Sequence, residues 1–455
     1  MNKIFSIFLK NSLIVFLLVF TISFSFFGFK TKSFQYLNIS NNDTTDIYAN
    51  DNYLRYDDYT YNKNIKTVLL YNLRDELSYP TLPLNSSEKL KLSFDDFNTS
   101  LKTYYYTFIH CNVNWTPSDL SPNQYLDNYT EDDIKEYKYS FNTDKAFIHY
   151  NLTFPNENIS IKLSGNYIIK VYDSDYPDEA VITKRFLVYE NHADVNITIK
   201  PSVNPNERFT RQEIDFEVNH NNYEINNPYQ NITVILMQNY RWDNAISGLK
   251  PKFINGSLLD YNYEAVNVFD GNNEFRNFDI KSMNFNSQNV YRVQYDNAEK
   301  MMNIILYEDL PRAFRKHYAQ PDLNGNFLVK RDDSNDSETD AEYVNVTFNL
   351  KRDTLRYGGN IYLFGKFTDW KFKEEFKMAY DTINKQYQQT VLLKQGYYNY
   401  MYCFVKDGSK NVGDISYIEG TYYETENDYT VLVYYRNPME NFDQLIGMKT
   451  RNTNK

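Results

Sequence analysis

His110 and Cys111 are the side chains in this sequence whose types come closest to nucleophilic chemistry. A thiol beside an imidazole suggests a nucleophile and its base. The run from Tyr104 to Cys111 is typical of a strand, however, and neighbouring residues on a strand point to opposite faces of the sheet. We therefore interpret the pair as the end of a strand, followed by a turn at Asn114 and Trp115.

The sequence offers little to a metal ion. None of its five histidines forms a pair at the spacing of metal ligands. Residues 322–326 have the look of the start of a calcium loop, but the twelfth position is Asp333 where a glutamate would be needed. A hairpin turn at Asn324 and Gly325 fits better. The phosphate-binding, dinucleotide-binding, G-x-S-x-G and H-E-x-x-H motifs are absent, so we predict neither an enzyme nor a cofactor.

The two cysteines, Cys111 and Cys403, lie far apart in the sequence. Two interpretations stay open. They are either two unpaired, buried thiols or one long-range disulfide formed in an oxidising compartment.

The first thirty residues predict export from the cytoplasm. Lys3 and Lys10 precede an apolar run from Leu13 to Phe29, which is the pattern of a secretory signal. The run is also near the shortest length that spans a bilayer. We therefore expect residues 1–30 to be a signal peptide or a retained anchor.

Composition limits the partners and favours sheets. The net charge is -11, whereas binding to nucleic acid requires a basic face. The chain contains 44 tyrosines and 32 phenylalanines, which suit the surfaces of pleated sheets.

Period-two alternation of apolar and polar residues marks the strands that must carry any site. It is clear at residues 90–94, 195–199, 214–218 and 344–348. The first of these runs is followed by a predicted turn at Asp95 and Asp96. Helical patterns are few, and residues 132–137 and 311–318 could each form a short helix. The predicted fold class is all-β, with tandem antiparallel β-sandwich domains of the immunoglobulin or early-set type.

Two polar stretches suggest where the domains end, near Asn191 and in the acidic run after Arg331. The predicted organisation is a signal peptide or anchor at 1–30, a flexible N-terminus at 31–60, β-sandwich domain 1 at 61–190, β domain 2 at 191–330, an acidic linker at 331–342, and early-set-like β-sandwich domain 3 at 343–450.

An ordered set of short motifs resembles the plug proteins of the type IX secretion system. The motifs occur at 65–68, 90–96, 109–115, 139–143, 155–156, 164–167, 238–244, 271–276, 393–400, 419–420, 426–429 and 445–447. The resemblance implies a non-catalytic periplasmic plug, associated with the outer membrane. Its implied partner is the outer-membrane translocon β-barrel of that system, whose inner mouth such proteins close.

Rigid aromatic and arginine side chains dominate many protein contacts. On that ground we predict partner-binding roles for Arg241, Trp242, Phe275 and Arg276. The alternative for each is ordinary packing inside the protein.

The C-terminal part supports an alternative function as an exported glycan-binding protein. Residues 361–370 and 400–408 resemble strands of glycogen-binding modules, with Trp370 in the place of a stacking platform. The second aromatic residue of such a site is missing after Gly408. We therefore expect Trp370 to be structural.

Overall fold

The computed structural model describes residues 53–98, 100–409 and 412–454. These residues belong to one compact unit. The predicted signal and the predicted flexible segment up to residue 52 lie outside the described residues. Within the described part of the chain, no helix is long and apolar enough to cross a membrane.

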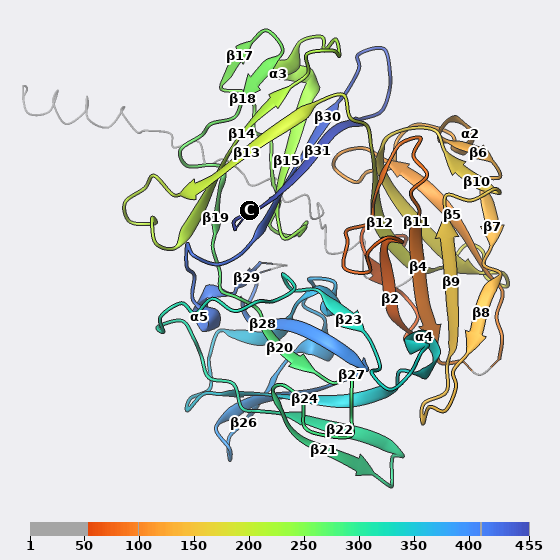
Figure 1. Cartoon of the computed structure of the whole chain (residues 1–455), viewed down its shortest axis with the longest axis vertical. Coiled ribbons are helices and arrows are strands. Elements are labelled where there is room, and N and C mark those ends of the chain that lie inside the picture. The colour runs from red at the N-terminus through yellow and green to blue at the C-terminus, as the bar shows by residue number, and fades with distance from the viewer. Residues whose placement is uncertain (1–52, 99, 410–411, 455) are drawn as a thin grey trace, which may run out of the picture. The chain divides into compact units, whose positions relative to one another are not determined.

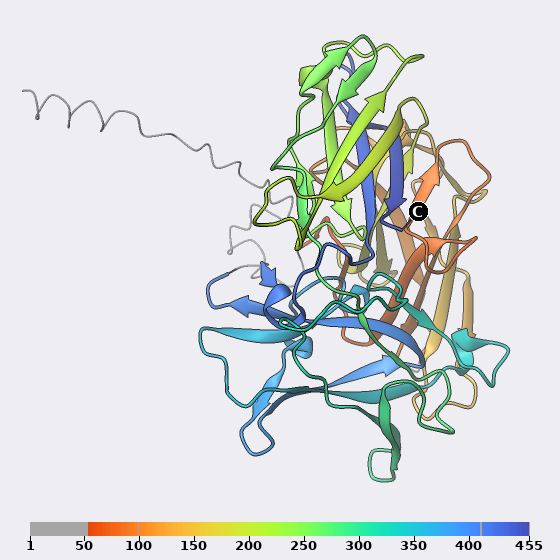
Figure 2. The ribbon, with the colours of Figure 1, turned by 60° about the vertical axis from the view of Figure 1, so that its left-hand side comes forward.

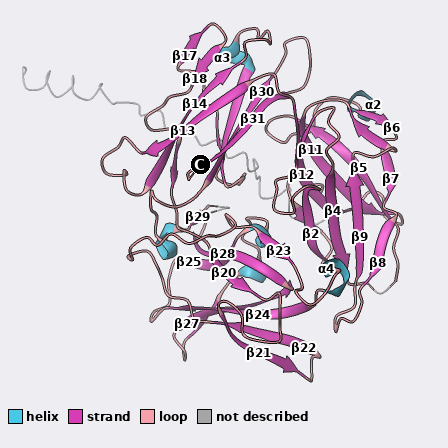
Figure 3. Cartoon of the chain, viewed as in Figure 1, coloured by secondary structure: helices cyan, strands magenta, loops and turns pink. Residues whose placement is uncertain are grey.

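Strands dominate the structure, as predicted, and helices are short (Figure 3). Most strand pairs are antiparallel, while β12 with β3 and β22 with β24 are parallel. Three apolar cores divide the described residues into three lobes. We name them the N-terminal lobe (residues 53–190), the middle lobe (191–271 and 428–454) and the C-terminal lobe (272–427).

The N-terminal lobe is a sandwich of two larger sheets, in the orders β1-β12-β11-β5-β7 and β2-β4-β9-β8, with β3 added to β12 and a small β10-β6 pair. Phe94, Phe108 and Tyr150 lie in its core. The elements are β1 (Tyr59–Thr60), β2 (Ile65–Asn72), β3 (Thr81–Pro83), β4 (Leu90–Asp96), β5 (Tyr104–Cys111), α2 (Pro122–Tyr125), β6 (Leu126–Asn128), β7 (Glu131–Asp133), β8 (Glu136–Tyr139), β9 (Ile148–Phe154), β10 (Ile159–Ile161), β11 (Gly165–Asp173) and β12 (Ala180–Tyr189).

The middle lobe pairs the sheet β13-β14-β18-β17, with β19 added to β14, with the sheet β16-β15-β30-β31. Its elements are β13 (Asp194–Pro201), β14 (Arg211–Asn219), α3 (Pro228–Asn231), β15 (Ile232–Gln238), β16 (Ile246–Ser247), β17 (Phe253–Asn255), β18 (Leu258–Asp260), β19 (Val268–Asp270), β30 (Asp428–Tyr435) and β31 (Gln444–Asn452).

The C-terminal lobe is built around the long strand β28, which pairs with β20, β23, β25 and β29, and around the sheet β21-β22-β24-β27-β26. Its elements are β20 (Arg276–Asp279), β21 (Val290–Asp296), β22 (Met301–Leu306), β23 (Phe327–Val329), α4 (Ser337–Asp340), β24 (Tyr343–Lys351), β25 (Gly359–Phe364), η2 (Lys366–Thr368), η3 (Glu374–Phe376), β26 (Ala379–Asp381), β27 (Gln386–Lys394), β28 (Gly396–Lys406), β29 (Gly413–Asp414) and α5 (Ser416–Glu419).

The chain leaves the middle lobe and later returns to it. The last two strands, drawn in dark blue, lie among the green and yellow strands of the middle lobe (Figures 1 and 2). Val234 of β15 pairs with Val433 of β30 along an antiparallel ladder. The predicted boundaries at 191–330 and 343–450 stay a prediction. From the strand pairing, we propose a middle lobe that the C-terminal lobe interrupts.

Two predicted helices and one predicted turn differ from the structure. Residues 132–137 form parts of β7 and β8, and residues 311–318 form a loop, so neither is a helix. The predicted turn at Asp95 and Asp96 is wrong, because both residues continue β4 and pair with β9. The acidic stretch contains α4, whose Glu338 accepts hydrogen bonds from Lys91 and Asn151 of the N-terminal lobe.

The interrupted middle lobe leads to a prediction about fragments. A fragment of residues 191–330 lacks β30 and β31, so half of its sandwich is missing and we expect no cooperative unfolding. Residues 191–271 joined by a short linker to residues 426–455 should fold, because this fragment contains both sheets of the sandwich. A short linker is enough, because Asn427 donates a hydrogen bond to the carbonyl of Gly271 at 2.9 Å. Near-ultraviolet circular dichroism and thermal melts would compare the two. A cooperative melt of the first fragment with none for the second would contradict the proposed division.

Candidate functional site

His110 and Cys111 do not form a catalytic pair. His110 contacts the hydroxyl of Ser118 at 2.9 Å and the carbonyl of Ser164 at 3.2 Å, while Cys111 packs with Trp115 in a separate apolar cluster. Burial lowers the pKa of His110 to about 4 and raises the pKa of Cys111 to about 12. The prediction that the two side chains face opposite sides is confirmed.

Both cysteines are buried and unpaired. The structure therefore favours the first of the two interpretations, two separate thiols. Burial also raises the pKa of Cys403 well above that of a free thiol. Neither side chain is an accessible thiolate of the kind that reacts readily.

Residues 323–326 form a tight turn, with Asn324 and Gly325 both at positive φ. The N–H of Asn326 donates to the carbonyl of Leu323 at 3.0 Å. A Cβ on Gly325 would lie 2.3 Å from the ring of Trp370, so only glycine fits here. The predicted turn is confirmed, but it is not a hairpin turn, because β23 follows it while no strand lies immediately before it, and β23 pairs with β28. Among the described residues, no group of three His, Cys, Asp or Glu side chains could hold a metal ion.

The four predicted partner-binding residues make internal contacts. The guanidinium of Arg241 donates to Asp243 at 2.6 and 3.0 Å, and it lies 5.0 Å from the ring centre of Trp370. Trp242 meets Trp115 edge to face, with ring centres 5.0 Å apart.

Phe275 and Arg276 are buried inside the C-terminal lobe. The ring of Phe275 contacts that of Trp370, and Arg276 pairs with Asp309 at 2.6 Å and Glu419 at 3.0 Å. The structure thus brings Arg241 and Phe275 to one aromatic cluster around Trp370. A partner-binding role for the four residues stays a prediction.

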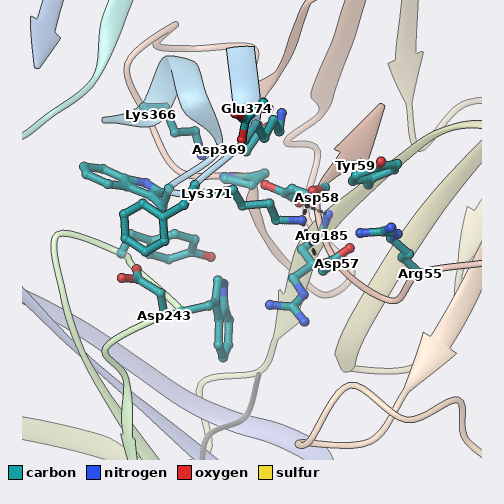
Figure 4. Close-up of a pocket in the computed structure, with 16 residues that line it drawn as sticks. Arg55, Asp57, Asp58, Tyr59, Arg185, Asp243, Lys366, Asp369, Lys371 and Glu374 are labelled. Atoms are coloured by element: carbon teal, nitrogen blue, oxygen red, sulfur yellow. Dashed lines mark hydrogen bonds and ion pairs between the residues drawn. The ribbon is translucent and has the colours of Figure 1, made fainter. Parts of the chain in front are cut away.

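A cavity of about 490 Å³ lies where the three lobes meet (Figure 4). Tyr59 and Arg185 come from the N-terminal lobe, Trp242 from the middle lobe, and Trp370 and Lys371 from the C-terminal lobe. Five cationic and five acidic side chains line it. They are Arg55, Arg185, Lys366, Lys371, Lys373, Asp57, Asp58, Asp243, Asp369 and Glu374.

Ion pairs across this cavity join the N-terminal and C-terminal lobes. Lys184 contacts Asp369 at 2.6 Å, and Lys371 contacts Asp57 at 2.7 Å. Burial by itself would raise the pKa of Asp369, but Lys184 and Lys373 lower it strongly. Lys184 and Lys371 each face a carboxylate of the other lobe, so these pairs hold the two lobes together.

A second, fully buried polar cluster joins the same two lobes. Asp95 on β4 contacts Lys394 on β27 at 2.6 Å, and each side chain is only 1% exposed. The second oxygen of Asp95 contacts His149 at 2.6 Å, and the Tyr343 hydroxyl donates to Asp95 at 2.6 Å. Lys394 also donates to the backbone carbonyl of Glu338 at 2.6 Å.

This cluster satisfies charges that burial would otherwise make unfavourable. Burial alone would raise the pKa of Asp95, but Lys394 and His149 together lower it. The pair therefore stabilises the folded state above the usual aspartate pKa. That contribution is lost as the pH falls through the lowered value.

The middle lobe is held against the N-terminal lobe mainly by apolar contacts. Tyr79 stacks on Tyr240 with ring centres 4.0 Å apart. The hydroxyl of Tyr434 donates to Asn166 at 2.7 Å. The remaining contacts include Cys111, Trp115, Ile168, Leu187, Ile235, Met237, Leu432 and Leu445, which form one cluster between the N-terminal and middle lobes.

Sequence reasoning missed Asp95 and Lys394 as a pair. Both residues lie within the motifs that resemble the plug protein family. Adjacent carboxylates such as Asp95 and Asp96 are common in an acidic chain, however, and so attracted no attention. The only local signal was that each charge directly follows an apolar strand segment. Their separation by 299 positions hid the contact.

Two buried carboxyl groups, those of Glu274 and Asp322, have raised pKa values. Burial raises the pKa of Glu274 to about 7 and that of Asp322 to about 7. Glu274 accepts hydrogen bonds from the backbone N–H of Glu426 at 3.1 Å and contacts His317 at 3.1 Å, while its Oε2 atom is buried without a partner among the described residues. The two acids are therefore partly protonated near neutral pH.

Comparisons with known proteins identify relatives. The family model of the type 9 secretion system plug protein 1st domain matches residues 65–190. A hypothetical protein from Parabacteroides merdae, known from a 2.30 Å crystal structure, is 32% identical with a TM-score of 0.84, over 88% of this chain and 100% of that chain. No curated protein matches the chain. The alkylpurine DNA glycosylase AlkC of Pseudomonas fluorescens, bound to DNA, is 9% identical over 28% of this chain and 30% of that chain, and its TM-score of 0.16 supports no conclusion.

The buried ion pair gives a stability prediction. Lys394→Met leaves Asp95 buried without its cation, which typically costs about 3–5 kcal/mol. The double variant Asp95→Asn with Lys394→Met should recover much of that loss, because no uncompensated charge remains. Urea unfolding would measure both.

The matched control for this test is Lys351→Met. Lys351 contacts Glu308 at 3.3 Å in an exposed pair of the same lobe, so its loss should cost less than about 1 kcal/mol. If Lys394→Met unfolds at the same urea concentration as this control, the buried pair does not hold the lobes together.

The raised pKa of Glu274 predicts a pH effect of definite sign. The folded protein keeps a proton on Glu274 up to a pH of about 7, whereas the unfolded chain releases it near 4.5. Wild-type stability should therefore fall as the pH rises from about 4.5 to about 7. Glu274→Gln removes this pH-dependent loss of stability, so the melting temperature of the variant should exceed that of wild type at pH 8.5 and match it at pH 4.

The exposed substitution Glu299→Gln on the same lobe is the control, and its effect should not change over this range. A difference between wild type and Glu274→Gln that is constant from pH 4 to pH 8.5 would contradict the prediction.

Proposed function

Because this chain belongs to the type IX secretion system plug protein family, we propose that it occludes the outer-membrane translocon barrel of that system. Membership of this family indicates a role in type IX secretion and a periplasmic or outer-membrane-associated location. We propose in addition that the protein acts by occlusion, that the barrel is its partner and that it catalyses no reaction.

The family match over residues 65–190 carries the proposal. That match covers most of the N-terminal lobe, the lobe that Asp95, Lys184 and Trp115 tie to the other two. Domains within one chain usually move relative to each other unless their interface is large and apolar or otherwise locked. Buried ion pairs and a shared apolar cluster favour a body that keeps its shape, as an occluder must.

Displacement of the plug needs only a modest energy difference. A two-state equilibrium moves from 1:99 to 99:1 with about 5.5 kcal/mol of differential binding. A secretion substrate or accessory protein could supply that difference by favouring the open barrel. The lobes themselves need not unfold.

We do not propose the glycan-binding alternative. The ring of Trp370 contacts Phe364 and Phe275, and Arg241 lies over it. A stacking platform for sugar requires a free aromatic face, and these contacts fit the expected structural role of Trp370.

The proposal predicts association with the barrel. The protein should co-purify with a very large outer-membrane β-barrel under mild detergent, with a chemical cross-linker present. A strain that lacks the protein should grow but become more sensitive to vancomycin, and deletion of the barrel as well should remove that sensitivity.

Complementation of the deletion strain with point variants tests whether the fixed arrangement of the lobes is needed for occlusion. Lys351→Met should restore vancomycin resistance fully, whereas Lys394→Met should restore less at equal protein level, because its lobes are no longer locked. Recovery of the protein only as a free periplasmic species, together with unchanged vancomycin sensitivity in the deletion strain, would contradict occlusion.

A further inference from the structure

Phe314 is exposed at the tip of a loop whose backbone is firmly anchored. Its relative exposure is 102%, so the ring touches almost nothing in the folded protein. The loop, residues 311–320, connects β22 to β23 in the C-terminal lobe. We call it the 311–320 loop.

The anchors of the 311–320 loop lie on both sides of Phe314. The backbone N–H groups of Arg312 and Ala313 both donate to the carbonyl of Ile418, at 2.7 and 3.0 Å. The guanidinium of Arg312 donates to Glu419 at 2.7 Å.

Beyond the tip, the hydroxyl of Tyr422 donates to the carbonyl of Arg315 at 2.5 Å, and Gln320 donates to the carbonyl of Phe275 at 2.9 Å. These contacts hold the loop in one conformation. The exposure of Phe314 is therefore a property of the fold rather than of a loose segment.

The side chains that directly follow Phe314 in the loop are basic and aromatic. Arg315 and Lys316 follow Phe314 directly, both are exposed, and neither makes an ion pair with a described carboxylate. Tyr318 is 78% exposed. His317 points back to Glu274 at 3.1 Å and belongs to the anchor.

We propose that the 311–320 loop binds an anionic phospholipid surface. Aromatic rings are favoured at the headgroup level of a bilayer, and Arg and Lys side chains are attracted to anionic headgroups. A small convex tip fits a lipid interface without a complementary shape, whereas a stable protein interface needs about 800 Å² from each partner.

The charge of the chain makes this site specific. With a net charge of -11, the protein as a whole is repelled by an anionic membrane. The proposed binding therefore relies on the local charges of Arg315 and Lys316. This inference goes beyond the proposed occlusion and does not require it.

The experiment places a fluorescent reporter at the tip of the full-length chain. Phe314→Trp adds an indole to those of Trp115, Trp242 and Trp370. The emission of wild type, which has only these three tryptophans, is subtracted to give the emission of the added indole. Vesicles of phosphatidylglycerol and phosphatidylethanolamine should shift the added emission to shorter wavelength, and brominated lipids should quench it. Vesicles of phosphatidylcholine should do neither.

The matched control is Phe285→Trp in the same lobe. Phe285 is 63% exposed and lies between two uncharged residues, Asn284 and Asn286. Its added indole should neither shift nor be quenched. This local readout separates the loop from any lipid binding by the apolar N-terminal run.

Charge removal gives the second arm. In the Phe314→Trp background, Arg315→Gln with Lys316→Gln should weaken the vesicle affinity reported by the indole by about fivefold for each cation removed. Lys63→Gln with Lys89→Gln, which removes two exposed cations elsewhere, should change it little.

An indole at position 314 that neither shifts nor is quenched with anionic vesicles would overturn the proposal, as would equal responses to anionic and zwitterionic vesicles. The vesicles contain no barrel, so either result would leave occlusion to its own test.

Discussion

The contact between Asp95 and Lys394 is the constraint on which the arrangement of the lobes depends. Removing two charges from water costs several kcal/mol for each ion, and their attraction offsets this only when further hydrogen bonds satisfy both groups. His149, Tyr343 and the carbonyl of Glu338 supply those bonds. The partners come from β4, β9, α4, β24 and β27, so the charges are satisfied only when both lobes are in place.

The other lobe contacts differ in kind and complement this one. The hydrophobic effect that favours an apolar cluster is non-directional, whereas a buried pair with directed hydrogen bonds requires a fixed geometry. The cluster around Trp115 therefore supplies contact area between the N-terminal and middle lobes. The pairs of Asp95 and Lys184 fix how the C-terminal lobe is set against the N-terminal lobe.

The fold class could be read from the sequence because it depends on local periodicity. The alternation at Val344, Val346 and Phe348 gives one buried face, and the structure has β24 there. The end of β4 could not be read, because Asp95 continues the strand by pairing with β9, and its buried charge is met by a lysine 299 residues away. Likewise, the apolar run of β30 does not say which sheet the strand joins. Pairing of distant segments leaves no local signal in a single sequence.

The return of the chain to the middle lobe also sets an order for folding. β15 must wait for β30, about two hundred residues later, before its sheet is complete. A pairing of such long range is slow to form, because the intervening chain must first be brought together. The N-terminal lobe has all its strands before residue 190 and can form first, and the C-terminal lobe can follow. A chain that emerges into its compartment from the N-terminus would thus keep β15 and its neighbours without their partner strands until the last segment arrives. Exposed apolar strands of this kind are where chaperones bind and where aggregation begins, so we expect the middle lobe to be the part of this protein most dependent on assistance while it folds.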